Sequence, residues 1–209
     1  MPILRYNLGP MDNNTYLIVD SMTNEVALVD PTFDSETIWE EIQESGYTLR
    51  YVLNTHAHFD HIIGNAYFLE NSSAILALHR NDLGFLHQLP VQAQMFGFSA
   101  KPSPEPSLFL EEGQTLMLGS TSIEVRFTPG HAPGHVTFLV EGAAIVGDCL
   151  FQGSIGRTDL PQSSLQTLMH SIQTQLLTLP DGTPVYPGHG APTTIGEERR
   201  HNPFLQELK

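Results

Sequence analysis

The sequence has little cysteine, few basic residues and no long apolar run. Its single cysteine, Cys149, excludes a disulfide within the chain and so a disulfide-built secreted scaffold. Nine Lys and Arg against 23 Asp and Glu give a formal charge of −14, which argues against a nucleic-acid partner held through its phosphates. No segment reaches the roughly 20 apolar residues that span a bilayer, and residues 1–6 lack the apolar core of a signal peptide. We therefore expect a cytoplasmic protein without a membrane or nucleic-acid partner.

The length and composition predict one folding unit. At 209 residues and 23.1 kDa, with 40% apolar residues, the chain can bury one substantial core but is short for two. We expect a single domain over residues 1–209, as a monomer or a homodimer. Bound divalent cations would offset part of its excess negative charge.

Hydrophobic patterning predicts two halves, each running from strands to a helix. Short or alternating apolar runs predict strands at 3–8, 15–19, 26–29, 51–53 and 74–78, and then, in a second half beginning near Leu108, at 115–118, 123–128, 136–140 and 143–147. Apolar residues at helical spacing predict helices around 38–42, over 62–69 and around 165–176, whereas 80–96 is helical or irregular. Two sheets flanked by outer helices, with loops at one edge, would accommodate this order.

Residues 55–61 crowd three histidines and one aspartate into one segment, Thr-His-Ala-His-Phe-Asp-His. Imidazole and carboxylate are ligands that divalent zinc, iron and manganese prefer, and the rings of a His-x-His pair lie on the same side of an extended backbone. The segment directly follows the strand predicted at 51–53, and α/β proteins commonly place their chemistry beyond the C-terminal end of a strand. The group His56, His58, Asp60 and His61 therefore indicates a metal site with room for more than one ion.

Three later segments each place one further ligand beside a glycine. These ligands are His131 in Thr-Pro-Gly-His, Asp148 in Gly-Asp-Cys-Leu and His189 in Pro-Gly-His-Gly. Glycine permits the tight backbone that turns a side chain inward. Together with the first segment they make five histidines and two aspartates, enough for two metal ions that share a carboxylate.

With these motifs the sequence resembles the metallo-β-lactamase superfamily, whose signature His-x-His-x-Asp-His stands at residues 56–61. The resemblance implies an α+β fold, an αββα sandwich of two mixed sheets flanked by helices. It also implies two bound divalent ions, with zinc expected and iron or manganese as alternatives. The implied ligands are His56, His58 and His131 for the first ion and Asp60, His61 and His189 for the second, with Asp148 bridging both.

Residues 151–161 and 202–205 look more narrowly like the short glyoxalase II-like branch of this superfamily, which contains hydroxyacylglutathione-hydrolase-type thioesterases. A basic residue that grips the substrate is expected where Arg157 stands. The resemblance therefore implies a small-molecule thioester or ester as substrate and Arg157 as a substrate-binding residue.

Metal chemistry independently favours hydrolysis. Two divalent ions about 3.5–4 Å apart can hold a bridging water, lower its pKa from about 15.7 towards ~7 and present hydroxide as the nucleophile. The ions can also stabilise the oxyanion and accept the leaving thiolate or alkoxide. We expect Asp60 and Asp148 to be catalytic, Asp60 because a carboxylate near that water can orient it or carry its proton away.

Other functions of the same residues stay open. A lactone or ester hydrolase would keep these ligands and differ in the shape of its pocket. A persulfide dioxygenase would use one iron, held by two histidines and an aspartate, to activate oxygen. Among neighbouring residues, we expect His135 to be a hydrogen-bonded structural histidine rather than support for a ligand, and Cys149 to be a buried thiol rather than a ligand.

Overall fold

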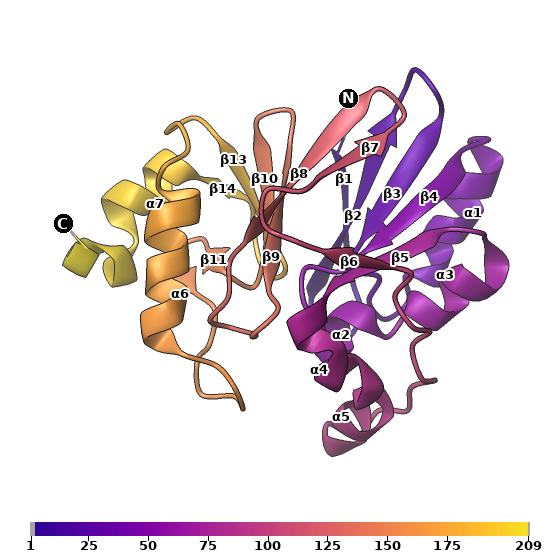
Figure 1. The fold of residues 1–209 in the computed structure, drawn as a ribbon, viewed down its shortest axis with the longest axis horizontal. Helices are drawn as coiled ribbons and strands as arrows, with labels where there is room; N and C mark the ends of the chain where they lie inside the picture. The colour runs from indigo at the N-terminus through magenta and orange to yellow at the C-terminus, as the bar shows by residue number, and fades with distance from the viewer. Residues whose placement is uncertain (1–2, 209) are drawn as a thin grey trace.

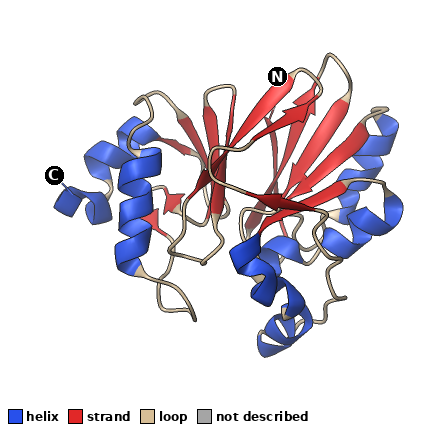
Figure 2. Cartoon of the chain, in the orientation of Figure 1, coloured by secondary structure: helices blue, strands red, loops and turns tan. Residues whose placement is uncertain are grey.

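Two sheets pack face to face, with helices on the outer side of each (Figure 1). The computed structural model describes residues 3–208. Figure 2 shows the same layers by type, with strands in the centre and helices at both flanks. This is the expected αββα sandwich, and because both sheets are mixed, the predicted fold class is confirmed.

The first sheet contains six strands in chain order. They are β1 (Ile3–Leu8), β2 (Asn13–Asp20), β3 (Glu25–Val29), β4 (Thr48–Leu53), β5 (Ile75–His79) and β6 (Leu108–Leu110). Strands β1 to β3 pair antiparallel and β3 to β6 pair parallel. The C-terminal ends of β3, β4 and β5 therefore meet at one edge.

The second sheet also contains six strands, in the order β14-β13-β10-β9-β8-β7. Their bounds are β7 (Thr115–Leu118), β8 (Thr121–Phe127), β9 (Val136–Val140), β10 (Ala143–Gly147), β13 (Pro184–Pro187) and β14 (Thr193–Thr194). Neighbours pair antiparallel except β10 and β13, which are parallel. A separate hairpin joins β11 (Leu150–Phe151) and β12 (Ser154–Ile155).

Alternation along the strands builds a core between the sheets. Side chains of a strand point to opposite faces in turn, so Tyr16 and Ile18 of β2 face the second sheet, where they join Phe138 of β9. The intervening Leu17 and Val19 face outward and are covered by helices. Full burial of a side chain such as Phe138 contributes roughly 1.5–3 kcal/mol.

Helices cover the outer faces through their apolar sides. On the first sheet these are α1 (Glu36–Glu44) and α3 (Asn65–Asn71), which contribute Ile38, Ile42 and Phe68. On the second sheet they are α6 (Leu165–Ser171), the π-helical η2 (Ile172–Leu176) and α7 (Ile195–His201), followed by the 3₁₀ segment η3 (Pro203–Leu208). At the lower edge in Figure 1 lie α2 (Phe59–Ile62), α4 (Leu83–His87) and α5 (Leu89–Met95), with the 3₁₀ turn η1 (Arg80–Asp82) before α4.

Two expectations about these elements differ from the structure in their bounds. The helix predicted over 62–69 is α3, which begins three residues later, at Asn65, because the chain at Gly64 packs against the loop after β3. There the Gly64 amide donates to Pro31 O at 2.9 Å, and a Cβ on Gly64 would lie 2.6 Å from Ser35 Oγ. The second half also begins later than Leu108, since β6 pairs parallel with β5 and so belongs to the first sheet.

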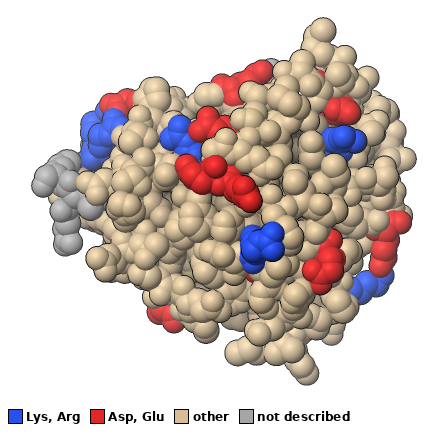
Figure 3. Space-filling model, in the orientation of Figure 1, with Lys and Arg blue, Asp and Glu red and all other residues tan. Residues whose placement is uncertain are grey.

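The surface carries few charged groups on the face drawn in Figure 3. Basic side chains stand singly there, among uncharged and acidic groups, and form no continuous patch. Within residues 3–208, no helix is long and apolar enough to cross a membrane.

Candidate metal centre

The residues singled out from the sequence come from four loops at one edge of the two sheets. His56 and His58 follow β4, and Asp60 and His61 lie in the short helix α2 that comes next. The other three ligands come from the second sheet, each after the C-terminal end of a strand. His131 follows β8, Asp148 follows β10 and His189 follows β13. The structure thus brings all seven side chains to one place.

One group consists of His56, His58 and His131. The possible ligand atoms of these three rings all lie within 4.8 Å of one another. His58 Nδ1 and His131 Nε2 are 2.9 Å apart. Two imidazole nitrogens on one tetrahedral ion, each about 2.0–2.1 Å from it, would be roughly 3.3 Å apart, so the spacing suits a shared ion.

A second group consists of Asp60, His61 and His189. Asp60 Oδ2 lies 3.5 Å from His61 Nε2 and 3.4 Å from His189 Nε2. Asp148 stands between the groups, because its Oδ2 is 3.5 Å from His131 Nε2 and 3.6 Å from His189 Nε2, while its Oδ1 is 3.5 Å from His61 Nε2. This is the arrangement expected of a bridging carboxylate.

Hydrogen bonds at the far side of the rings set which nitrogen faces the centre. His131 Nδ1 donates to the carbonyl oxygen of Arg157 at 2.9 Å, and His189 Nδ1 donates to that of Met11 at 3.1 Å. A carbonyl only accepts, so each Nδ1 carries the proton and each Nε2 keeps its lone pair for a ligand.

Asp30 orients His61, a role that sequence reasoning missed. Its carboxylate accepts from Thr55 N at 2.7 Å, from Thr55 Oγ1 at 2.6 Å and from His61 Nδ1 at 3.2 Å. Thr55 Oγ1 in turn lies 3.0 Å from His56 Nδ1. The available signal was its position directly after β3, the parallel neighbour of the strand that precedes the histidines.

Asp82 is a second buried carboxylate beside the centre that the sequence did not reveal. It accepts hydrogen bonds from Ala57 N, between two ligand histidines, and from Gly134 N in the loop of His131. It thereby ties a loop of the first sheet to a loop of the second. Burial raises the pKa of Asp82 to about 6.

The electrostatics of the centre favour a cation. Burial lowers the pKa of His61, but the carboxylates of Asp60 and Asp148 outweigh burial and raise this pKa well above its ordinary value. Burial raises the pKa of Asp148, yet the adjacent His61 holds it below its usual range. Burial, with His131 nearby, lowers the pKa of His58 to about 3. The ionised carboxylates thus draw positive charge to this place, and on metal binding His61 would give up its proton, because imidazole ligates as the neutral ring.

The residues fit bound metal ions. His56 Nε2 and Asp148 Oδ1 are buried and have no hydrogen-bond partner, although a buried unpaired polar atom costs about 1–3 kcal/mol. A cation would satisfy both atoms. The centre is also shaped around the ligands, since a Cβ on Gly188 would lie 2.2 Å from Asp148 Oδ1.

His135 and Cys149 lie beside the centre and outside its ligand groups. His135 is buried, its Nε2 accepts from Asp148 N at 3.1 Å, and its Nδ1 lies 2.9 Å from Thr128 Oγ1. It is therefore a hydrogen-bonded residue that also fixes the backbone of Asp148. Cys149 packs in the apolar core under α6, where burial raises the pKa of its thiol.

A cavity of about 350 Å³ opens over the centre. Asp60, His131, Asp148 and His189 line its floor. Its walls are mainly apolar and come from α2, from α4 and α5, and from the loop after β12; they include Phe59, Phe85, Met95, Phe96, Leu160 and Pro161.

Arg157 lies among the residues that line this cavity, but its guanidinium is paired. Its Nε and Nη2 each donate to Asp159, at 2.7 Å, and its side chain is 57% exposed. A substrate anion would compete with Asp159 for this group.

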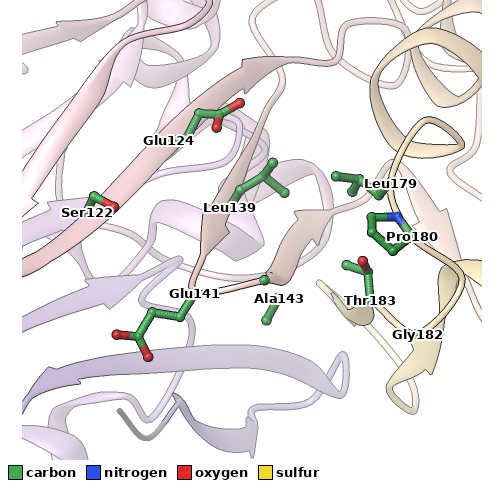
Figure 4. Close-up of a pocket in the computed structure, with 10 residues that line it drawn as sticks. Ser122, Glu124, Leu139, Glu141, Ala143, Leu179, Pro180, Gly182 and Thr183 are labelled. Carbon is green, nitrogen blue, oxygen red and sulfur yellow. The ribbon is translucent and has the colours of Figure 1, made fainter.

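A second hollow, of about 430 Å³, lies on the second sheet away from the centre (Figure 4). Figure 4 shows Glu124 and Glu141 well apart in it, and Glu124 pairs with Arg126 at 3.0 Å. No histidine lines it, so the metal-binding cavity is the better candidate for chemistry.

Comparison with known proteins now decides the family. Residues 8–189 match the Metallo-beta-lactamase superfamily. The chain belongs to this superfamily. Among relatives, the hydroxyacylglutathione hydrolase GloC of Haemophilus influenzae is 40% identical over 197 residues, 92% of each chain. The persulfide dioxygenase ETHE1 of Homo sapiens is 33% identical over 198 residues, 91% of this chain and 70% of that one.

Two solved structures superpose closely on the chain. The BLEG-1 B3 metallo-beta-lactamase has a TM-score of 0.91 at 34% identity and covers 98% of this chain and 99% of its own. TTHA1623 in a di-iron-bound form has a TM-score of 0.89 at 37% identity, over 97% of this chain and 100% of its own. The chain therefore has a metallo-β-lactamase fold with a metal-binding His/Asp cluster, and its relatives include both a hydrolase and a dioxygenase.

Proposed function

We propose that the chain is a metal-dependent hydrolase of small thioesters that works with two divalent ions. The main support for two ions is the position of Asp148, whose two oxygens face both ligand groups. A single-iron dioxygenase site needs only two histidines and one aspartate. Here Asp60, His61 and His189 form a second group of three ligands, which supports a site for two ions. The hydroxyacylglutathione hydrolase relative supports a thioester as substrate.

Two bound ions would supply an activated water and a Lewis acid for the substrate carbonyl. The side chains of the protein would position these ions and keep negative charge beside them. Asp148 stays ionised beside His61, and Asp60 stays ionised with its Oδ2 facing the same space. Asp60 is thus placed to orient the water and to take its proton as it attacks.

The cavity supports a small substrate whose carbonyl reaches its floor. Phe59 and Phe96 stack at 4.8 Å between ring centroids and form an apolar wall beside Asp60. Such a wall excludes water from the reacting carbonyl, which strengthens electrostatic interactions there. We assign Arg157 to the binding of a polar or anionic end of the substrate.

Steady-state kinetics with S-lactoylglutathione and with neutral acyl thioesters would test this function. We expect turnover with two metal ions per chain, loss on treatment with a chelator and recovery when zinc, iron or manganese is restored. An acyl-homoserine lactone would compare the lactonase alternative directly. Absence of thioester turnover from protein carrying two ions would overturn the proposal.

The persulfide dioxygenase alternative is favoured by the relative ETHE1 and needs its own measurement. Oxygen uptake with glutathione persulfide, in protein loaded with iron under reducing conditions, would detect it. We expect no uptake above the rate of metal-free protein. Rapid uptake with one iron per chain would favour the dioxygenase over the hydrolase.

A further inference from the structure

Asn13 is a buried residue at the start of β2 that no motif singles out. Its backbone forms an isolated antiparallel bridge with His189. The next residue, Asn14, binds the same loop: its N donates to Gly188 O at 2.7 Å and its side-chain amide donates to Pro187 O at 2.9 Å. The start of β2 is thereby held against the loop that carries a candidate ligand, and the Asn13 side chain is only 1% exposed.

The carboxamide of Asn13 lies within the second ligand group. Its Nδ2 donates a hydrogen bond to Asp60 Oδ2 at 2.8 Å and lies 3.4 Å from His189 Nε2 and 3.5 Å from His61 Nε2. Asp60 Oδ2 is itself 3.4–3.5 Å from the two ring nitrogens. Donor atoms around one ion at about 2.0–2.2 Å are separated by roughly 3.3 Å. The amide atom is therefore close enough to these three atoms to share an ion with them.

The other end of this amide is unsatisfied. Asn13 Oδ1 is buried and has no hydrogen-bond partner. The oxygen and nitrogen of a carboxamide exchange places when the group turns by half a rotation, at no change in shape. After that turn Oδ1 takes the place of Nδ2, facing His61 and His189, where a cation would satisfy it, and a bond to the cation would replace the hydrogen bond from Nδ2 to Asp60 Oδ2.

We propose that Asn13 is a ligand of the second metal ion, through its neutral oxygen Oδ1. The inference rests on the proposed two-ion centre and adds a residue to it. The second ion would then have five protein ligands. Asp60, Asp148 and Asn13 would each supply an oxygen, and His61 and His189 would each supply a nitrogen. Zinc prefers four ligands, whereas iron and manganese accept more and suit oxygen-rich sets. Asn13 accordingly favours iron or manganese over zinc at the second position.

Metal titration of two variants tests the proposal without relying on catalysis. Apoprotein, Asn13→Ala and Asn13→Asp would be titrated with Mn²⁺ and with Zn²⁺ by calorimetry, with metal content counted by elemental analysis. We expect Asn13→Ala to bind the second ion about 10- to 100-fold more weakly, the range seen when a supporting group around a metal is lost, with the first ion unaffected. Asn13→Asp places a charged oxygen at the same position, so it should keep the second ion and favour Mn²⁺ further.

The Asn13→Asp variant also separates ligation from hydrogen bonding. If Asn13 acts only by donating to Asp60, the new carboxylate cannot donate and repels Asp60, so this variant should bind the second ion as weakly as Asn13→Ala. That result, or undiminished second-ion binding by Asn13→Ala, overturns the proposal. Should Asn13→Ala fail to fold, Asn13→Asp still decides.

Asn14→Ala is the matched control for a purely structural role. It removes the hydrogen bonds that hold the His189 loop but leaves the carboxamide of Asn13 in place. We expect it to lower the thermal stability of the apoprotein and to keep the relative preference for Mn²⁺ over Zn²⁺ at the second site. Equal loss of that preference in both variants would contradict ligation by Asn13. Failure of the unmodified protein to bind a second ion would instead count against the two-ion function itself.

Discussion

Replacing Asp148 by asparagine removes one negative charge at the point where the two ligand groups meet and keeps the size of the side chain. In the folded chain this carboxylate faces His131, His189 and His61 at 3.5–3.6 Å. A neutral amide has one oxygen to offer, and it bridges two cations poorly. We expect Asp148→Asn to weaken the binding of both ions.

The size of the loss follows from burial. Asp148 is 7% exposed, so water screens its charge little. Removing one member of a buried charge pair costs about 3–5 kcal/mol, and about 1.4 kcal/mol corresponds to a factor of ten. Affinity for the ions should therefore fall by roughly 10²- to 4 × 10³-fold.

Calorimetric titration of apoprotein with Zn²⁺ or Mn²⁺, together with elemental analysis after dialysis, would measure this loss. Asp159→Asn is the matched control, because it makes the same chemical change at a carboxylate that is 68% exposed and paired with Arg157. That control should bind both ions as the unmodified protein does. Two tightly held ions in Asp148→Asn would refute the bridging role.

Three further outcomes follow from the structure. Burial raises the pKa of Asp82 to about 6, from about 3.9 in the unfolded chain, so the native apoprotein binds this proton more tightly than the unfolded chain does. The resulting stabilisation is complete below about pH 4 and is lost as the pH rises through 6. Urea unfolding of apoprotein at several pH values should show that loss, of order 3 kcal/mol, and Asp82→Asn should lack it. Asp159→Asn frees the guanidinium of Arg157, so it should raise kcat/KM severalfold for an anionic thioester but not for a neutral one. An unchanged ratio of the two kcat/KM values would contradict a role of Arg157 in binding the substrate. Metal addition should raise the thermal unfolding midpoint, since a ligand at 100 times its Kd stabilises the native state by about 2.7 kcal/mol, and a midpoint unmoved by excess metal would show that the ions do not bind the folded protein.

The sequence alone was sufficient for the candidate ligands and for most strands. His56, His58, Asp60 and His61 stand within six positions, so their proximity needs no knowledge of the fold. The long strands were predictable as well, because their apolar residues alternate or run together, as in β2 and β8.

The residues that support the ligands were not predictable, because their contacts join segments far apart in the chain. Asp30 meets Thr55 across 25 positions, and Asp82 meets Gly134 across 52. An isolated aspartate after a strand has the same local appearance whether it binds a backbone amide or faces water. The short elements β14 and α7 were missed for a similar reason, since two or seven residues carry too little periodicity to predict.

Each ligand group draws on both sheets, and this explains the need for such supports. His56 and His58 come from the first sheet and His131 from the second; Asp60 and His61 likewise face His189 across the same junction. A shift of one sheet against the other would therefore pull both groups apart together. The apolar core between the sheets resists that shift only through contacts without direction, whereas the hydrogen bonds of Asp82 to the loops on either side fix the register of the two edges. The two backbone donors offset part of the cost of burying the Asp82 carboxylate, and because one donor belongs to each side of the junction, the same hydrogen bonds link the two loops that carry the ligands.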